Sequence, residues 1–340
     1  MDLTSAGWQP PSDWLRLTVI DSHAGGEPFR VVLDGLPDIP GDSVLERRRY
    51  AREHLDHLRR VLMWEPRGHA DMYGGWVGPP TEPGSDVSVL FLHNEGFSTM
   101  CGHGIIALAK VLIDTQPGIS DGRLVIDTPA GTVSSRSVID QGRVTATSFL
   151  NVASFVSDLD AVVDVPEVGE VIYDLAFGGA YYTYVRASSV GVSLDDVSGL
   201  IDAGRAVKRA VMESTTIVHP VEPDLSFLYG VIFTGPAENA GSHSRNVCVF
   251  ADGEVDRSPT GTGVSGLLAI LHARGELDVG DSVTVESIVG STFTGRIDSS
   301  TSFHGQSAVI PEISGRAHLT GRAEFWLDPD DDLGSGFLIR

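Results

Sequence analysis

The sequence predicts an α+β protein made of two copies of one fold that face each other. Met100–Ile105 reads Met-Cys-Gly-His-Gly-Ile and Pro259–Val264 reads Pro-Thr-Gly-Thr-Gly-Val, so two similar segments lie 159 positions apart. In each copy a short apolar strand precedes the segment and an apolar helix follows it. A gap-free repeat that includes a strand, a glycine-rich turn and a helix indicates two pseudo-symmetric domains.

The predicted elements follow from apolar periodicity and from the positions of Gly and Pro. The first half contains strands Leu15–Ile20 and Phe29–Leu33 around the glycine-rich turn Asp21–Pro28, an amphipathic helix Arg47–Met63, an ordered loop Glu65–Asp86, strand Val89–Leu92, helix Ile105–Ile113 and short strands within Leu124–Phe155. The second half contains strand Val247–Phe250, helix Val264–Leu271, short strands within Ser282–Phe303 and a last strand Ala323–Leu327. The same offset relates Gly131 to Gly290, and a weaker echo relates Ala24-Gly25-Gly26 to Phe177-Gly178-Gly179.

The domain boundaries follow from the repeat. We expect an N-terminal arm at 1–14, a first domain at 15–155 and a second domain at 156–322. Because the two repeat lengths differ, we assign 323–340 to the first domain, so that the last strand returns to it. The arm contains a Pro-Pro pair, and we expect it to drape loosely over the surface.

Length and charge limit the classes of partner. The chain has 340 residues, 41% of them hydrophobic, and a net charge of −22. This charge argues against nucleic acid and against anionic membrane surfaces. The N-terminus lacks a basic region followed by an apolar core, and no stretch reaches the roughly 18 to 20 apolar residues of a membrane span. We therefore expect a cytoplasmic protein that acts on a small molecule, with a homodimer as the expected assembly.

The chain has two cysteines, Cys101 and Cys248. Two are too few for a disulfide framework or a four-cysteine zinc site. Cys248 lies in an alternating apolar strand, and we interpret it as a buried free thiol.

The remaining metal and cofactor signals are weak. Lys110 and Lys208 are the only lysines, and both lie in helical patterns, where we expect them to be solvated and unsuited to a pyridoxal Schiff base. His54 and His57 are spaced i, i+3 without a third ligand nearby, so a solvated helix face is favoured over a metal pair. We expect neither a metal nor an organic cofactor.

Cys101 lies at the start of a predicted helix. Unpaired backbone N–H groups and the positive end of the helix dipole act there, so we expect the pKa of its thiol to fall from about 8.5 into roughly 3.5 to 7.5. Gly102, Gly104, Gly261 and Gly263 let the backbone approach a ligand and direct N–H groups at an anion. Two facing helix N-termini therefore predict a site for one carboxylate, such as that of an amino acid.

Three other interpretations of these residues are open. Gly261–Gly266 matches the dinucleotide fingerprint G-x-G-x-x-G, although a loop separates it from its strand and no βαβ unit surrounds it. Cys101 with His103 would suit a thiol hydrolase, although residues two apart at a helix start do not face each other. A plain N-cap with small packing glycines explains one copy of the segment but not its recurrence.

These segments resemble the signature motifs of the proline racemase superfamily. Met100–Gly104 and Asp256–Gly263 look like its two motifs, and Asp21–Pro28, Pro66–Tyr73 and Ser314–His318 also match. The resemblance covers the chain from about Leu15 to Leu327. It implies the diaminopimelate-epimerase-like fold: two α+β domains, each a strongly curved sheet around a central helix, with the active site in the interdomain cleft.

The resemblance also implies a reaction class. Racemases and 4-hydroxyproline epimerases of this superfamily have cysteine in both motifs; one thiol removes the Cα proton and the other delivers a proton to the opposite face. This chain has Thr260 in the second motif, which is the pattern of the trans-3-hydroxy-L-proline dehydratases. A threonine hydroxyl is a far weaker acid than a thiol, so return of the proton to the second face is blocked.

We therefore hypothesise a cofactor-independent hydro-lyase. The Cys101 thiolate would remove the Cα proton of trans-3-hydroxy-L-proline, and loss of the 3-hydroxyl would give Δ1-pyrroline-2-carboxylate. The backbone N–H groups of Gly102, His103, Gly261 and Thr262 would stabilise the enediolate.

Three points of this hypothesis concern individual groups. The resemblance implies that His103 and Asp256 hold the ring nitrogen of the substrate. The hydroxyl and the Cα hydrogen of the trans substrate share one face, so the elimination is syn. Either Cys101 or His103 would protonate the departing hydroxide, while Thr260, on the other face, would be an N-cap and a ligand contact.

Two other functions stay open: a proline racemase or hydroxyproline 2-epimerase that uses a non-cysteine acid, and a non-catalytic amino-acid-binding paralogue.

Overall fold

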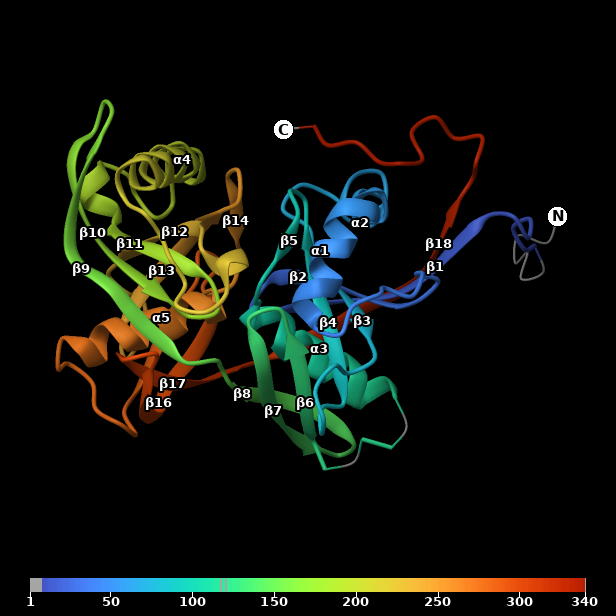
Figure 1. The fold of residues 1–340 in the computed structure, drawn as a ribbon, viewed down its shortest axis with the longest axis horizontal. Coiled ribbons are helices and arrows are strands. Elements are labelled where there is room, and N and C mark those ends of the chain that lie inside the picture. Colours follow the sequence, from blue (N-terminus) through green and yellow to red (C-terminus); the bar gives the residue numbers. More distant parts are fainter. Residues whose placement is uncertain (1–7, 117, 120, 340) are drawn as a thin grey trace.

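The structure is a computed structural model that describes residues 8–116, 118–119 and 121–339. Figure 1 shows two lobes side by side, the first from blue to green and the second from green to orange-red. The last strand, in red, leaves the second lobe and runs back through the first. The molecule therefore has the two halves that the repeat predicts.

The first half is built from β1 (Leu15–Ala24), β2 (Glu27–Asp34), α1 (Val44–His54), α2 (Asp56–Met63), β3 (Tyr73–Gly78), β4 (Val87–His93), β5 (Phe97–Ser98), α3 (Gly102–Thr115), β6 (Arg123–Thr128), β7 (Gly131–Asp140) and β8 (Arg143–Leu150). The second half is built from β9 (Ser154–Val165), β10 (Gly169–Phe177), β11 (Tyr181–Arg186), the 3₁₀ turn η1 (Ala187–Val190), α4 (Val197–Ser214), η2 (Pro223–Leu225), β12 (Leu228–Gly235), β13 (Ser244–Phe250), β14 (Glu254–Asp256), α5 (Gly261–Ala273), β15 (Ser282–Glu286), β16 (Thr292–Phe303) and β17 (Gln306–Gly315). The final strand is β18 (Ala317–Leu327).

The two halves share one pattern of strand pairing. In the first, β2 pairs in parallel with β3, β3 pairs antiparallel with β4, and β4 pairs with both β5 and β6. In the second, β11, β12, β13, β14 and β15 repeat these pairings in the same order and directions. The central helices α3 and α5 follow β5 and β14. The predicted repeat is therefore a repeat of topology as well as of sequence.

One strand of the first half comes from outside the simple chain order, whereas its counterpart in the second half does not. β18 pairs antiparallel with β1 from Leu15 opposite Leu327 to Ala24 opposite Ala317, as β9 pairs with β10 in the second half. The return strand that we predicted at Ala323 begins at Ala317. β8 also pairs with β17, so backbone hydrogen bonds join the two halves. The division of the chain at 155/156 and 322/323 stays a prediction.

The central helices are apolar around their whole circumference, which is typical of a helix that is buried on all sides. The residues of α3 from Gly102 to Ala109 and those of α5 from Gly261 to Leu271 are all buried. One hydrophobic core contains the apolar side chains of both helices. Two further cores lie under α1 and α2 and under α4, on the outer faces of the sheets.

The predicted helix Arg47–Met63 is wrong as a single element. The structure has α1 and α2, which are separated at Leu55, where φ is −123° and ψ is 13°. Each helix has a buried arginine that bonds the backbone near β5: Arg48 donates to the Phe97 carbonyl, and Arg59 donates to the His93 carbonyl at 3.0 Å. The break lets both helices bury their apolar sides against the same sheet.

The predicted loop Glu65–Asp86 contains a strand. β3 lies in it and pairs in parallel with β2. Its glycines hide the strand signal, but they allow the close approach: a Cβ on Gly74 would lie 2.7 Å from the Arg30 carbonyl oxygen, and one on Gly75 would lie 2.7 Å from the Phe29 ring.

Smaller differences concern the N-terminal region. The turn predicted at Asp21–Pro28 is only Gly25-Gly26, because β1 continues to Ala24 and β2 begins at Glu27. Gly178-Gly179 follows β10 in the same way, as the weaker echo predicts. Residues 1–7 of the predicted arm lie outside the described residues, and Trp8 packs on Trp326 of β18 with ring centroids 5.1 Å apart.

Candidate active site

The N-termini of the two central helices meet through glycine. A Cβ on Gly102 would lie 2.6 Å from the Cα of Gly261, and a Cβ on Gly261 would lie 2.8 Å from the Cα of Gly102. Any side chain at either position would force the helices apart. The contact brings the N–H groups of both first turns to one place, where their dipoles favour an anion.

The seven residues that the sequence predicts for the site line one cavity between the helix N-termini: Cys101, Gly102, His103, Asp256, Thr260, Gly261 and Thr262. Their chemical roles stay predictions. The cavity has a volume of about 10 Å³, which is about the space of one water molecule. The structure therefore describes a closed site.

Cys101 caps its own helix. Its backbone is extended, with φ −147° and ψ 106°, so the side chain turns back over the first turn and Sγ accepts a hydrogen bond from Gly104 N at 3.2 Å. The same orientation brings Sγ to 3.2 Å from His103 Nδ1. The expectation that these two residues do not face each other is therefore wrong, because Cys101 is not itself helical.

Burial reverses the expected direction of the Cys101 pKa. The thiol is buried, and loss of solvation raises its pKa well above the ordinary value; the negative charges of Asp256 and Glu27 add to the rise. The Gly104 N–H opposes it, as does hydrogen bonding by the Tyr73 side chain. In the closed site desolvation outweighs the helix N-terminus, so the predicted lowering is wrong.

His103 is neutral in this setting. Burial lowers the pKa of its imidazole to about 4, although the charge of Asp256 acts in the opposite direction. Its ring meets the ring of Tyr73 edge-on, with centroids 4.9 Å apart. A neutral imidazole beside Sγ is able to accept or return a proton, but it is not a fixed positive charge.

We expected Thr260 to be an N-cap, but its side chain does not cap α5. Its φ is +63° and its ψ is 91°, a conformation that β-branched residues rarely adopt. Its hydroxyl donates to Asp256 Oδ2 at 2.8 Å, and Ser258 N donates to Asp256 Oδ1 at 2.7 Å. Asp256 therefore holds the loop before α5 and leaves the first N–H groups of this helix without a side-chain cap.

Cys248 also lines the cavity, which we did not expect of a strand thiol. It lies opposite Asp256 in the β13–β14 pair. Burial raises the pKa of this thiol well above the ordinary value, and the Thr260 side chain opposes the rise by hydrogen bonding. The second half therefore places a thiol beside Thr260.

The remaining wall is aromatic and was missed at the sequence level. It consists of Tyr73, Tyr182, Tyr229 and Phe250, with Met100 beside them. Tyr182 Oη lies 2.8 Å from Thr262 Oγ1. Tyr73 is the last residue of Pro66–Tyr73, a segment that matches the family, so the sequence did give a reason to consider it. Nothing near Tyr182 or Tyr229 in the sequence marks them as site residues.

Two buried carboxylates link the halves around the site. Glu27 of β2 accepts a hydrogen bond from Arg257 N at 2.7 Å, and burial raises the pKa of Glu27 well above its usual range. His93 Nδ1 lies 2.9 Å from Glu254 Oε1. Both contacts join a strand of the first half to the segment 254–257, and so they fix how the two helix N-termini meet.

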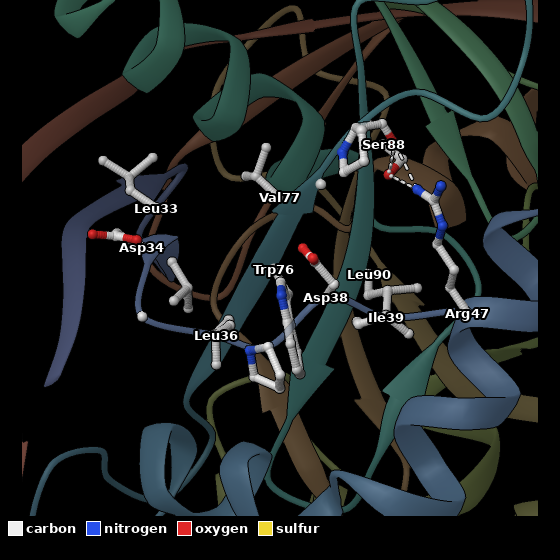
Figure 2. A pocket seen from close by; sticks show the side chains of 15 residues that line it. Leu33, Asp34, Leu36, Asp38, Ile39, Arg47, Trp76, Val77, Ser88 and Leu90 are labelled. Atoms are coloured by element: carbon white, nitrogen blue, oxygen red, sulfur yellow. Dashed lines mark hydrogen bonds between the residues drawn. The ribbon is translucent and has the colours of Figure 1, made fainter. Parts of the chain in front are cut away.

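Other features of the described residues show where chemistry is not expected. A cavity of about 440 Å³ lies beside β2, β3 and β4, and its Arg47 guanidinium donates to Ser88 Oγ at 3.0 Å (Figure 2). Neither a thiol nor an imidazole lines it. Lys110 and Lys208 are half-buried and donate to the Val144 and Ala251 carbonyls, so they are not solvated as expected. In the part of the chain that the structure describes, no three His, Cys, Asp or Glu side chains are grouped to hold a metal.

None of the described helices has both the length and the apolar character that a membrane crossing requires.

Comparisons with known proteins agree on one family. The family model described as proline racemase matches residues 19–338. A trans-3-hydroxy-L-proline dehydratase from Colwellia psychrerythraea is 42% identical over 98% of this chain and 96% of its own. A 3-hydroxyproline 2-epimerase from Burkholderia multivorans is 43% identical over 95% of this chain and 98% of its own. The crystal structure of a hydroxyproline epimerase from Agrobacterium vitis with bound trans-4-hydroxy-L-proline is 31% identical, with a TM-score of 0.90 over 97% of this chain and 96% of that chain. This last likeness confirms the expected fold.

Proposed function

The chain belongs to the proline racemase family, and on that premise we propose that it dehydrates trans-3-hydroxy-L-proline to Δ1-pyrroline-2-carboxylate without a cofactor. One observation carries the proposal. The cavity is lined by the Cys101 thiol at the N-terminus of α3 and by the Thr260 hydroxyl at the equivalent position of α5. The site thus has a base at the first motif and no thiol at the second. The names of several relatives support the same reaction.

The substrate carboxylate binds between the two helix N-termini. The backbone N–H groups of Gly102, His103, Gly261 and Thr262 are the donors, and the close glycine contact brings both sets to one anion. Because charge develops on the carboxylate as the Cα proton leaves, these donors stabilise the enediolate more than the substrate.

The secondary amine of the substrate lies near Asp256 and His103. Asp256 is buried and already oriented by Thr260 and Ser258, so its carboxylate is a fixed partner for an ammonium. His103 contributes as a neutral group because of its low pKa. A charged amine between these groups also acidifies the adjacent Cα–H bond.

Substrate binding requires the two halves to separate. The cavity of about 10 Å³ cannot hold a proline ring. In the open state water reaches Cys101, and the helix N-terminus with the Gly104 N–H then favours the thiolate. Closure expels water and strengthens the fixed dipoles around the reacting atoms.

The chemical step begins when the Cys101 thiolate takes the Cα proton. The electron pair then forms the C2–C3 double bond as the C3–O bond breaks, and the resulting enamine tautomerises to the imine. Thr260 is unable to reprotonate the opposite face because its hydroxyl is a weak acid and is bound to Asp256. The intermediate therefore loses water instead of inverting.

A second candidate function is epimerisation of 3-hydroxyproline at C2. The observation that favours it is Cys248, a thiol in the same cavity beside Thr260, together with the printed name of the Burkholderia multivorans relative. In that reaction Cys248 would supply the proton that Thr260 cannot. Inversion without loss of water is the distinguishing product.

The test is incubation of the purified protein with trans-3-hydroxy-L-proline, trans-4-hydroxy-L-proline and L-proline in D₂O. Pyrroline-2-carboxylate from the first substrate alone, lost in Cys101→Ser, supports the dehydratase. Formation of the D-epimer with deuterium at C2, lost in Cys248→Ser, supports the epimerase. If neither product forms from any of the three substrates, both reactions are contradicted, and a non-catalytic amino-acid-binding protein is the remaining interpretation.

A further inference from the structure

The group that protonates the departing hydroxide must lie on the face of Cys101. This requirement rests on the proposed dehydration, in which the 3-hydroxyl and the Cα hydrogen share one face of the ring. Hydroxide is a poor leaving group, so a proton must reach the oxygen as the C–O bond breaks. Thr260 and Cys248 belong to the second half, and therefore the donor has to be sought around Cys101.

Tyr73 is a buried phenol on that side. It lies at the start of β3, lines the cavity with Cys101, and is 3% exposed. Its ring stacks on His93 with centroids 5.6 Å apart and meets His103 edge-on at 4.9 Å. Packing from several directions fixes where its hydroxyl points.

The Tyr73 hydroxyl is part of a hydrogen-bonded chain. It bonds Ser98 Oγ and lies 3.1 Å from the Tyr229 hydroxyl of the other half. It also acts on Cys101, because hydrogen bonding by the Tyr73 side chain opposes the rise in the thiol pKa. The phenol thus lines the same cavity as the base and is hydrogen-bonded to two further hydroxyls.

The protonation state suits a donor. Burial raises the pKa of Tyr73 well above its ordinary value, so the phenol keeps its proton at neutral pH. The bonds from Ser98 and Tyr229 act in the opposite direction and would stabilise a short-lived phenolate. His103, the other neighbour of Cys101, is neutral and has no excess proton to give.

We propose that the Tyr73 hydroxyl protonates the leaving oxygen and regains its proton from Cys101. The thiolate takes the Cα proton and becomes a thiol; the C3–O bond breaks while Tyr73 gives its proton to the oxygen, which leaves as water. The Cys101 thiol then gives its proton to the phenolate. Both side chains return to their starting states, and the substrate has lost one water molecule.

The test compares two leaving groups in Tyr73→Phe. The variant keeps the ring packing and removes only the hydroxyl. With trans-3-hydroxy-L-proline we expect kcat to fall by about 10²-fold or more, the usual contribution of a general acid. With trans-3-chloro-L-proline, which gives the same pyrroline product, chloride leaves without a proton, so we expect a fall below about tenfold.

Tyr182→Phe is the matched control. It removes the hydroxyl of another cavity tyrosine, which bonds Thr262 in the second half. It should lower kcat for the hydroxy and the chloro substrate by the same factor. A second measurement follows deuterium at C2 of unreacted trans-3-hydroxy-L-proline in D₂O, which Tyr73→Phe should accumulate because proton removal continues without elimination.

Two results would overturn the proposal. Equal losses for the hydroxy and chloro substrates in Tyr73→Phe would give Tyr73 a purely structural role. A loss below tenfold for the hydroxy substrate would assign the donor to another group, with Cys101 itself next. If the wild-type protein forms no pyrroline from either substrate, the proposed function itself fails, and that result is separate from any effect of Tyr73.

Discussion

The two helix N-termini share a topology and differ in one side chain each. At α3, Cys101 has an extended backbone, and its sulfur folds over its own helix to accept the Gly104 N–H. At α5, Thr260 has a positive φ, and its hydroxyl turns away from the helix to Asp256. The N-terminus of α3 therefore has a sulfur over its first turn, whereas that of α5 has only backbone N–H groups there.

The difference suits a symmetric scaffold to the asymmetric reaction that we propose. A β-branched residue in the left-handed region costs on the order of 1 to 3 kcal/mol, which the surrounding contacts must offset. Ser258 and Asp256 supply those contacts, since both bond the Thr260 segment. In the proposed reaction the second half would use its backbone donors to hold an anion, and the first half would use its cysteine to move a proton.

The largest expected effect comes from removing the thiol. Cys101→Ser should lower kcat for the dehydration by at least about 10³-fold, because a serine hydroxyl is a much weaker acid and is not ionised near neutral pH. Thr260→Ser keeps a hydroxyl for Asp256 and should lose about tenfold or less. If steady-state assays show equal losses of kcat in the two variants, the two helix N-termini do not differ in their catalytic roles.

A smaller effect should follow from separating the N-termini. Gly102→Ala places a Cβ 2.6 Å from the Cα of Gly261, so closure is hindered and kcat/KM should fall by roughly 10²-fold, as expected for a displacement of about 1 Å. Gly96→Ala is the matched control, because nothing lies within 4 Å of the added Cβ. Kinetics and Tm of both variants check this, and similar values for the two would contradict a closed catalytic state.

The pH dependence tests which influence on Cys101 prevails. Because burial raises the thiol pKa in the closed site, the thiolate is the minor form there near neutrality, and kcat, which reports the closed complex, should rise about tenfold per unit between about pH 6 and 8. A profile that is flat over this range would mean a lowered pKa, and hence that the helix N-terminus outweighs burial. Initial rates in buffers of constant ionic strength provide the measurement.

The smallest expected effect is a gain. Thr260→Cys places a thiol at the second N-terminus and should allow slow C2 inversion of trans-4-hydroxy-L-proline. The rate should be on the order of 1% of the parental dehydration rate, because the positive φ at this position and the lost bond to Asp256 leave the new thiol misplaced. Chiral chromatography detects the epimer, and the double variant with Cys101→Ser should lose it. Absence of any epimer would indicate that more than one residue separates the two reactions.

The sequence was informative where the repeat was strong. The paired motifs predicted both central helices and the residues that line the cavity, because glycine at a helix start and apolar residues all around a helix are local signals. It failed for β3, where the glycines that permit the close approach to β2 also remove the strand pattern. The helix break at Leu55 was missed because the apolar spacing continues through it.

Other features of the site depend on distant parts of the chain. The Cys101 pKa follows from burial by the second half and from Glu27 and Asp256, which no local pattern around position 101 reports. Tyr229 reaches the Tyr73 hydroxyl from 156 positions away. The left-handed backbone at Thr260 was equally hidden, since threonine is a poor candidate for positive φ.

The strand β18 has a consequence for biosynthesis. β1 is made long before its second neighbour, Ala317–Leu327, so one edge of the first sheet stays open until the second half has been synthesised. The core around α3 includes Ala317 of that strand. The half that carries Cys101 therefore cannot finish folding on the ribosome ahead of the other half. A nascent chain that stops before β18 exposes an unpaired strand edge to neighbouring molecules.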